Sequence, residues 1–183
     1  PLSVTKDELI AVMSEHTDLR VVHIGSLVLT LEPSSSSILA ALGAFQPLPV
    51  VFLDPNVRPA VISDAEAFRS RMDEAMAIAS IMKLSDEDLS YLYPHVDVHA
   101  KAASLAQERG LHVILTLGRD GAVWYTPEGT AHRQGIIDLP VIDTVGAGDT
   151  FSGSILTYLH DRGSFGRDGE EPAMHALSPT VIE

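Results

Sequence analysis

The sequence predicts an α/β fold, with a mainly parallel sheet and helices on both faces. Two observations carry this prediction. Short apolar runs alternate with segments of helical periodicity along most of the chain, and glycine, proline or capping residues bound each run. This alternation is typical of right-handed crossovers between parallel strands. We expect one domain over residues 1–183, with a core at about 5–163 and an irregular tail at 164–183.

The composition limits the partners of the chain. Lysine and arginine number 12 against 25 aspartates and glutamates, which gives a net charge of −13. Such an acidic chain is poorly suited to bind nucleic acid or an anionic membrane. The sequence contains no cysteine and no apolar run long enough to span a membrane. We therefore expect a cytoplasmic protein without disulfides, and the scattered histidines do not suggest a metal site.

In the first half of the chain, capping residues and apolar runs indicate the elements. Thr5 and Glu8 have the spacing of a capping box, which predicts a first helix. Residues 20–26 predict a short buried strand that ends in a glycine turn, whereas 27–32 is ambiguous between strand and loop. The next expected elements are a helix from Pro33, a buried strand at 49–53, a helix from Ser63 to about Ala79 and a strand at 81–84.

The second half continues the alternation. Ser85 and Asp88 form another capping box and predict a helix. An amphipathic helix is expected from Asp97 to Arg109, closed by Gly110. The following elements are a strand at 112–117, a turn at 118–121 and an antiparallel excursion at a sheet edge, formed by 121–125 and 131–134.

A glycine-rich turn at 143–150 precedes the last predicted helix. It follows a strand-like apolar run at 136–142, and apolar side chains from Phe151 to Leu159 recur at helical spacing. Gly163 suits the left-handed residue just past a helix end. A glycine turn that opens a helix lets an anionic ligand approach free N–H groups and the positive end of the helix dipole.

Asp149 stands inside this turn, where a carboxylate would repel an anion. Its presence makes sense if it takes a proton from a nucleophile beside a phosphate. The alternative is a helix cap, for which aspartate is a favoured residue. The turn is neither a Walker A loop, because no Gly-Lys-Ser/Thr follows, nor a dinucleotide fingerprint, because Phe151 stands where the third glycine belongs.

The segment DTVGAGDTFSGSIL, residues 143–156, resembles the C-terminal motif of the ribokinase-like (PfkB) family of carbohydrate kinases along its whole length. The resemblance implies an ATP-dependent sugar kinase that phosphorylates a primary hydroxyl. It also implies that Asp149 is the catalytic base. The backbone of Gly146, Ala147 and Gly148 would then form the anion hole for the transferring phosphoryl group.

Further motifs extend the resemblance from about Val21 to Leu159, in the family's order. DPNVRP, residues 54–59, makes Asn56 and Arg58 candidates for contact with substrate or phosphate, although turn chemistry explains this segment equally well. Ser85 and Asp88 occupy the positions at which the family holds Mg²⁺ through water, although helix capping also explains both. The resemblance implies ATP contacts at Lys83, Thr116, Gly118, Gly121 and Thr144, and makes Asp143 a candidate ligand of K⁺ or a residue that stabilises the turn.

Within the family, HIGSLVL, DPNVRP and KLSDEDLSYLYP are most similar to segments of bacterial fructokinases. Family members are longer. Their glycine-rich sugar motif, a sugar-binding aspartate and a lid sheet would precede Pro1, and a closing helix would follow Glu183. We therefore expect an incomplete ribokinase-like fold without the lid, inactive or poorly soluble as an isolated polypeptide.

The expected partners are ATP and a small sugar, with neither nucleic acid nor membrane, and the full-length protein is a candidate homodimer. The residues that would choose between sugar and nucleoside acceptors lie largely in the part of the family that this chain does not match. A non-catalytic nucleotide-binding or interaction module derived from a truncated sugar kinase is the alternative function. Replacing Asp149 by Asn would distinguish the two.

Overall fold

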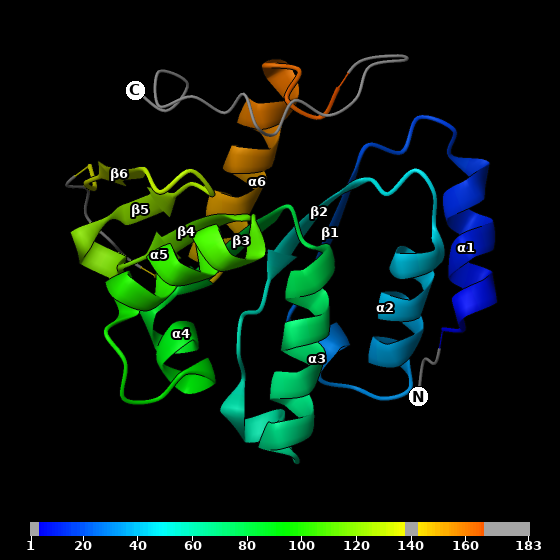
Figure 1. Ribbon diagram of the computed structural model, residues 1–183, viewed down its shortest axis with the longest axis horizontal. Helices are drawn as coiled ribbons and strands as arrows, with labels where there is room; N and C mark the ends of the chain where they lie inside the picture. Colours follow the sequence, from blue (N-terminus) through cyan, green and yellow to red (C-terminus); the bar gives the residue numbers. More distant parts are fainter. Residues whose placement is uncertain (1–3, 138–142, 167–183) are drawn as a thin grey trace.

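The computed structural model describes residues 4–137 and 143–166 and confirms the α/β prediction. Its described strands form one sheet in the order β1-β2-β3-β4-β5-β6 (Figure 1). The pairs from β1 to β4 are parallel, and β5 and β6 continue the sheet in antiparallel fashion. The strands are β1 (Val21–Gly25), β2 (Val50–Asp54), β3 (Ile81–Ser85), β4 (His112–Thr116), β5 (Ala122–Tyr125) and β6 (Ala131–Gln134).

The helices begin and end largely where the capping residues predict. The Thr5–Glu8 capping box opens the first helix, Asp64 caps the third, and Gly110 adopts the left-handed conformation after the fifth. The α-helices are α1 (Lys6–Glu15), α2 (Ser34–Ala44), α3 (Ala65–Ile78), α4 (Asp86–Leu92), α5 (Val98–Arg109) and α6 (Ala147–Asp161). Short 3₁₀ helices are η1 (Ser26–Leu29), η2 (Pro59–Val61) and η3 (Gly118–Asp120). Among the described helices, none combines the length and apolar character that crossing a membrane requires.

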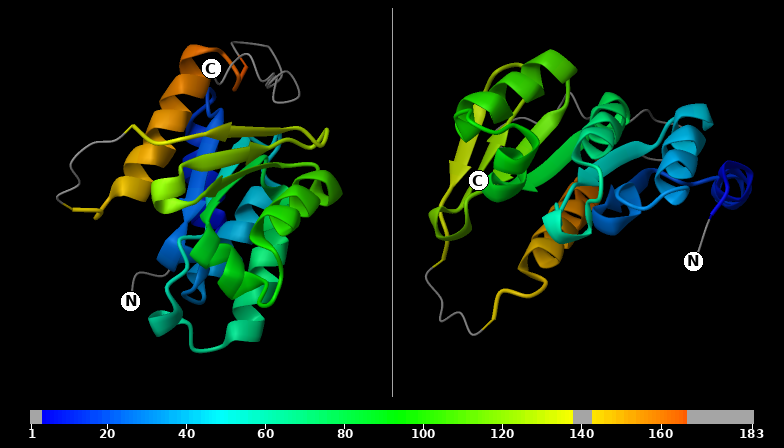
Figure 2. Two further views of the ribbon diagram at one scale, coloured as in Figure 1. Left: turned by 90° about the vertical axis from the view of Figure 1, so that its left-hand side faces the viewer. Right: turned by 90° about the horizontal axis from the view of Figure 1, so that it is seen from below.

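The helices cover the two faces of the sheet unequally. α2, α3 and α5 lie on one face, which we call the multi-helix face, and α1 packs against α2. Of the described helices, α6 alone lies on the opposite face, which we call the α6 face (Figure 2). The alternation of side chains along each strand decides which residues meet which helices. In β2, Val51 and Leu53 join the core of the multi-helix face, whereas Phe52 joins the core under α6.

The core under α6 is the smaller of the two. Its buried members are Val50, Phe52, Ile81, Ile114, Trp124, Leu159 and Phe165. Phe165 follows the left-handed Gly163 and lies within the stretch expected to be an irregular tail. The rest of that stretch, residues 167–183, lies outside the described residues.

Two strand predictions need correction. β1 is half-buried rather than buried, and its His23 is exposed, because β1 lies at the edge of the described sheet and pairs with β2 alone. Ile136 and Ile137 belong to no strand and are 54% and 81% exposed. They follow the edge strand β6, beyond which the described residues offer no further strand to pair with. Leu139, Val141 and Ile142 of the same run lie outside the described residues.

Candidate active site

The N-terminal turn of α6 lies against the carboxyl ends of β2 and β3. Ser152 Oγ donates a hydrogen bond of 3.0 Å to Oδ2 of Asp54, the last residue of β2. A Cβ atom added to Gly148 would lie 3.0 Å from Nζ of Lys83 on β3. In open α/β sheets, ligands bind outside the carboxyl ends of the strands. This turn is therefore placed where such a sheet offers a binding site.

The turn itself presents backbone N–H groups. Asp143 Oδ1 accepts a hydrogen bond of 3.0 Å from the N–H of Val145, and Gly146 takes a left-handed φ of 75° as the residue before the helix. The N–H of Ala147 donates to the carbonyl of Thr144 at 3.1 Å. In the described part of the chain, the N–H groups of Gly146 and Gly148 have no acceptor. Of the three predicted anion-hole amides, two are thus available to a ligand.

Asp149 is the third residue of α6, and its side chain is exposed. Within residues 4–137 and 143–166, its carboxylate makes no hydrogen bond and no ion pair. The first turn of a helix is a favourable position for a carboxylate because of the helix dipole. A carboxylate that is exposed and unpaired has the accessibility that a general base needs.

A buried ion pair lies beneath the turn. Lys83 Nζ lies 3.1 Å from Asp54 Oδ2, and the two side chains are only 7% and 5% exposed. Both project toward α6, because they alternate with residues that face the multi-helix core. Asp54 Oδ1 has no partner among the described residues. The ammonium of Lys83 is therefore a buried positive charge that lies next to Gly148.

Sequence reasoning predicted a role for Lys83 but missed Asp54 and Ser152. A signal for Asp54 exists, because VVFLD and IMKLS are neighbouring apolar strands that each carry one charge. Opposite charges inside adjacent buried strands indicate an ion pair. Ser152 gives no comparable signal, since a serine in a helix is usually exposed.

Asp88 links two predicted segments of the site. It forms the expected capping box with Ser85, whose N–H donates to Asp88 Oδ2 at 3.0 Å. Its other carboxylate oxygen accepts a hydrogen bond of 2.8 Å from the N–H of Val57, in the loop that follows β2. Both oxygens of this buried carboxylate are therefore engaged. The carboxylate fixes the position of the loop relative to α4.

Asn56 and Arg58 lie in that same loop. Asn56 has a left-handed φ of 40°, and its side chain is half-buried. Arg58 is exposed, and its Nη1 lies 3.5 Å from the carbonyl oxygen of Val57. The guanidinium makes no ion pair within the part of the chain that the structure describes. It is free to meet an anion from outside.

Apart from Lys83 on β3, the predicted nucleotide-binding residues lie at the end of β4, on the turn after it and just before α6. Thr116 ends β4, and its Oγ1 lies 3.4 Å from the carbonyl oxygen of Leu84. Gly118 and Gly121 bound η3 with positive φ angles, and a Cβ on Gly121 would lie 2.0 Å from the Gln134 carbonyl oxygen. No described hydrogen bond joins this turn to Thr144 or to the Lys83–Asp54 pair. Thr116 nevertheless pairs with Ser85 in the adjacent strand β3, two residues from Lys83.

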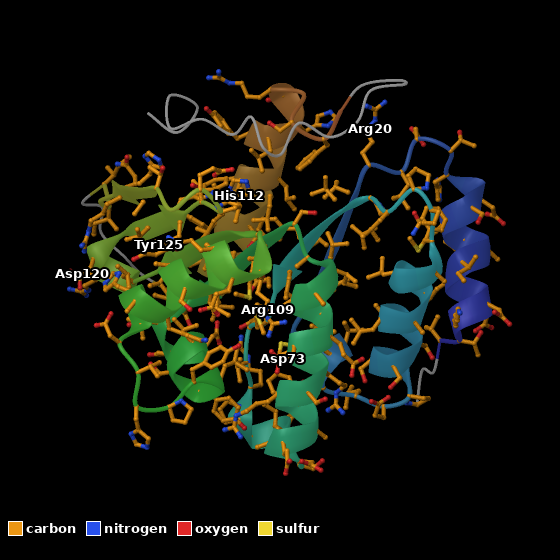
Figure 3. The ribbon with its side chains drawn as sticks, in the orientation of Figure 1. Arg20, Asp73, Arg109, His112, Asp120 and Tyr125 are labelled. Carbon is orange, nitrogen blue, oxygen red and sulfur yellow. The ribbon has the colours of Figure 1, made fainter. Side chains whose placement is uncertain are left out.

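His99 and His112 contact aromatic residues rather than one another. Trp124 Nε1 donates to His112 Nδ1 at 3.0 Å, and His99 Nδ1 lies 2.7 Å from the Tyr125 hydroxyl. Figure 3 labels His112 and Tyr125, which lie on the β4–β5 side of the sheet. The described residues contain no group of three or more histidine, aspartate or glutamate side chains that could hold a metal ion.

The sequence model of the pfkB family of carbohydrate kinases matches residues 3–172. A curated relative, the fructokinase of Rhizobium leguminosarum bv. trifolii, is 35% identical over 144 residues, which are 78% of this chain and 43% of that protein. The chain therefore spans less than half the length of this relative.

Solved structures give the same result. The fructokinase of Vibrio cholerae O395, crystallised with fructose, ADP and calcium, is 31% identical, with a TM-score of 0.68 over 76% of this chain and 45% of that chain. A double mutant of that enzyme was crystallised with fructose, ADP and potassium at the same TM-score. The aminoimidazole riboside kinase of Salmonella enterica, in complex with aminoimidazole riboside and an ATP analogue, is 26% identical, with a TM-score of 0.71 over 88% of this chain and 52% of that chain.

Proposed function

This chain belongs to the pfkB family of carbohydrate kinases, and we propose that it forms the phosphate-binding part of an ATP-dependent kinase that phosphorylates a primary hydroxyl of fructose. One observation carries the proposal. The N-terminal turn of α6 combines two available N–H groups, an exposed Asp149 and, beneath Gly148, the buried ammonium of Lys83.

Phosphoryl transfer requires positioning and charge stabilisation more than covalent chemistry from the protein. The N–H groups of Gly146 and Gly148, with that of Ala147 if Thr144 releases it, would stabilise the transferring group. Lys83 would add positive charge from below. Asp149 would accept the proton of the attacking hydroxyl.

The nucleotide would extend from this turn toward Thr116, Gly118 and Gly121 after β4, with Thr144 near its phosphates. Positive φ angles at both glycines let the backbone approach a flat or charged ligand closely. On the other side, Asn56 and Arg58 would meet the substrate or the phosphate. A planar, exposed guanidinium suits recognition of phosphate.

Metal ions would assist at two places. Magnesium neutralises the charge of nucleotide phosphates when it is bound and keeps several of its waters. Ser85 and Asp88 would hold it through such waters, because each Asp88 oxygen accepts one backbone N–H group and keeps a second lone pair for a water. Asp143 would contribute to a K⁺ site, since the hydrogen bond from Val145 leaves its second oxygen available among the described residues.

The proposal is tested by a coupled assay of ADP release with ATP, Mg²⁺ and a panel of sugars and nucleosides. Because the chain spans less than half of the Rhizobium leguminosarum fructokinase, the assay compares this chain with the full-length protein that contains it. Fructose should give the highest turnover. If a nucleoside gave the highest turnover instead, the proposed acceptor would change from fructose to a nucleoside, as in the aminoimidazole riboside kinase. No ADP release with any acceptor would overturn the kinase function.

Asp149→Asn is the decisive variant. We expect kcat to fall by about 10²–10⁴-fold or more while ATP affinity is kept, because the proton acceptor is lost and the nucleotide contacts remain. Asp161→Asn, at the far end of the same helix, is the matched control and should retain full turnover. Undiminished turnover in Asp149→Asn would rule out the base role and favour a module that binds nucleotide without catalysis.

A further inference from the structure

Ser152 is an unusual residue of α6 because its small polar side chain is buried. It is 1% exposed, whereas its neighbours Gly153 and Ser154 are exposed. Its hydrogen bond to Asp54 Oδ2 connects residues 98 positions apart. Ser152 stands four residues after Gly148, and positions four apart lie on the same side of a helix. The contact therefore fixes the rotation of the turn that carries Gly148 and Asp149.

The carboxylate of Asp54 depends on few donors. Oδ2 receives Lys83 Nζ at 3.1 Å and Ser152 Oγ at 3.0 Å, and Oδ1 has no partner within the described ranges. A buried carboxylate that loses a donor is destabilised strongly, because no water replaces the missing hydrogen bond. If Lys83 left, Ser152 would be the remaining donor.

Lys83 is in a position to leave. Its ammonium carries three donors, and Asp54 Oδ2 is its partner among the described residues, so a second acceptor can draw Lys83 partly away from Asp54. A Cβ atom added to Gly148 would lie 3.0 Å from Lys83 Nζ, so this ammonium lies directly beside the turn proposed to bind phosphate. A phosphate at this turn would therefore share the ammonium with Asp54 and weaken the contact between Lys83 and Asp54.

We propose that Ser152 is a positioning residue whose hydroxyl holds the Asp54 carboxylate while Lys83 turns toward the phosphates of the nucleotide. This inference rests on the proposed function, because it takes the α6 turn as the place where the phosphates bind. Ser152 would then contribute to the affinity for a ligand whose phosphates contact Lys83. It would contribute nothing to the affinity for the nucleoside part of the ligand.

The test is the variant Ser152→Ala, with binding measured by calorimetry for adenosine, ADP and ATP in the same Mg²⁺ buffer. We expect adenosine affinity to stay unchanged and ATP affinity to fall by about tenfold or more, the usual effect of losing a hydrogen bond to a charged group. Equal losses for adenosine and ATP would show a merely structural role and overturn the inference.

Two further variants keep the test sharp. Ser154→Ala is the matched control, because this exposed hydroxyl donates to the Thr150 carbonyl within the same helix at 2.8 Å, and it should alter none of the three affinities. In an Asp54→Asn background, adding Ser152→Ala should have little further effect on ATP affinity, since a neutral amide does not require a donor to replace Lys83. A full tenfold loss in that background would contradict the mechanism.

The two proposals fail in different ways. If the unaltered protein binds none of the three ligands, the proposed function and this inference fall together. If it binds ATP and Ser152→Ala binds ATP equally well, the inference is wrong and the proposed function stands.

Discussion

The two faces of the sheet differ in chemistry although they share the same strands. In β3, Met82 and Leu84 point into the multi-helix face and meet apolar side chains of several helices. Lys83, between them, points to the α6 face and meets Asp54 and, through it, Ser152. On the multi-helix face, a charge pair such as Asp73 with Arg109, 2.8 Å apart between α3 and α5, stays at the surface (Figure 3).

On the proposed function, this difference separates residues that stabilise the fold from residues that would bind a ligand. Burying apolar side chains stabilises a domain at about 25 cal/mol per Å². A buried ion pair is weak support for stability, because removing two charges from water offsets most of their attraction. We infer that the α6 face keeps Asp54 and Lys83 for binding, and the predictions below test that division.

The largest effect is expected for Lys83→Met. It leaves the Asp54 carboxylate buried without its cation, so the free energy of unfolding should fall by about 3–5 kcal/mol, measured by urea denaturation. The double variant Lys83→Met with Asp54→Val carries no buried charge and should recover most of that stability. Its ATP affinity should not recover. Recovery of ATP binding in the double variant would show that the pair is not needed for the ligand.

A comparable but somewhat smaller effect is expected on the other face. Leu84 is fully buried next to Lys83 in sequence, and Leu84→Ala should lower the free energy of unfolding by about 2–5 kcal/mol through the lost burial and the cavity left behind. At temperatures where the variant stays folded, calorimetric titration should give unchanged ATP affinity. If Leu84→Ala bound ATP as weakly as Lys83→Met does, the two faces of the sheet would not differ in their contribution to ATP binding.

The smallest effect concerns the titratable group at the edge of the multi-helix face. Burial raises the pKa of the Tyr125 hydroxyl above its ordinary value, with a further rise from the nearby Asp97 carboxylate. A raised pKa in the folded state means that the unfolded chain releases the proton first. The stabilisation is therefore complete below about pH 10 and is lost as the pH rises through the raised pKa.

Urea denaturation between neutral pH and pH 11 measures this loss, and Tyr125→Phe is the control. The variant should show a shallower fall of stability with pH, whatever its stability at pH 7. An identical slope in both proteins would assign the alkaline loss to other groups, such as Tyr93, whose pKa burial also raises.

Much of the fold follows from local signals, and the site follows only in part. The Ser85–Asp88 capping box and the left-handed Gly110 are decided by residues a few positions apart, so the sequence predicts them directly. The expected strand at Ile136 failed because apolar alternation cannot tell whether a neighbouring strand is present to pair with.

The site depends on contacts that no local pattern reports. The glycine turn before α6 could be predicted because its glycines, its aspartate and the helix after it are contiguous. The sequence does not predict that Asp88 both caps α4 and accepts a hydrogen bond from Val57, because these two segments meet only through tertiary packing. The partnership of Ser152 with Asp54 is the extreme case.

The spacing of these contacts along the chain has a consequence for assembly. Lys83 and Asp54 are 29 residues apart and belong to consecutive strands, whereas Ser152 is 98 residues from Asp54. Closing a short loop loses less chain entropy than closing a long one, and local contacts form faster during folding. The ion pair can therefore assemble with the β2–β3 unit, and the docking of α6 completes the constellation afterwards. On the proposed function, the ability to bind phosphate would therefore arise only when α6 docks on the sheet, and ligand binding would report on that docking step.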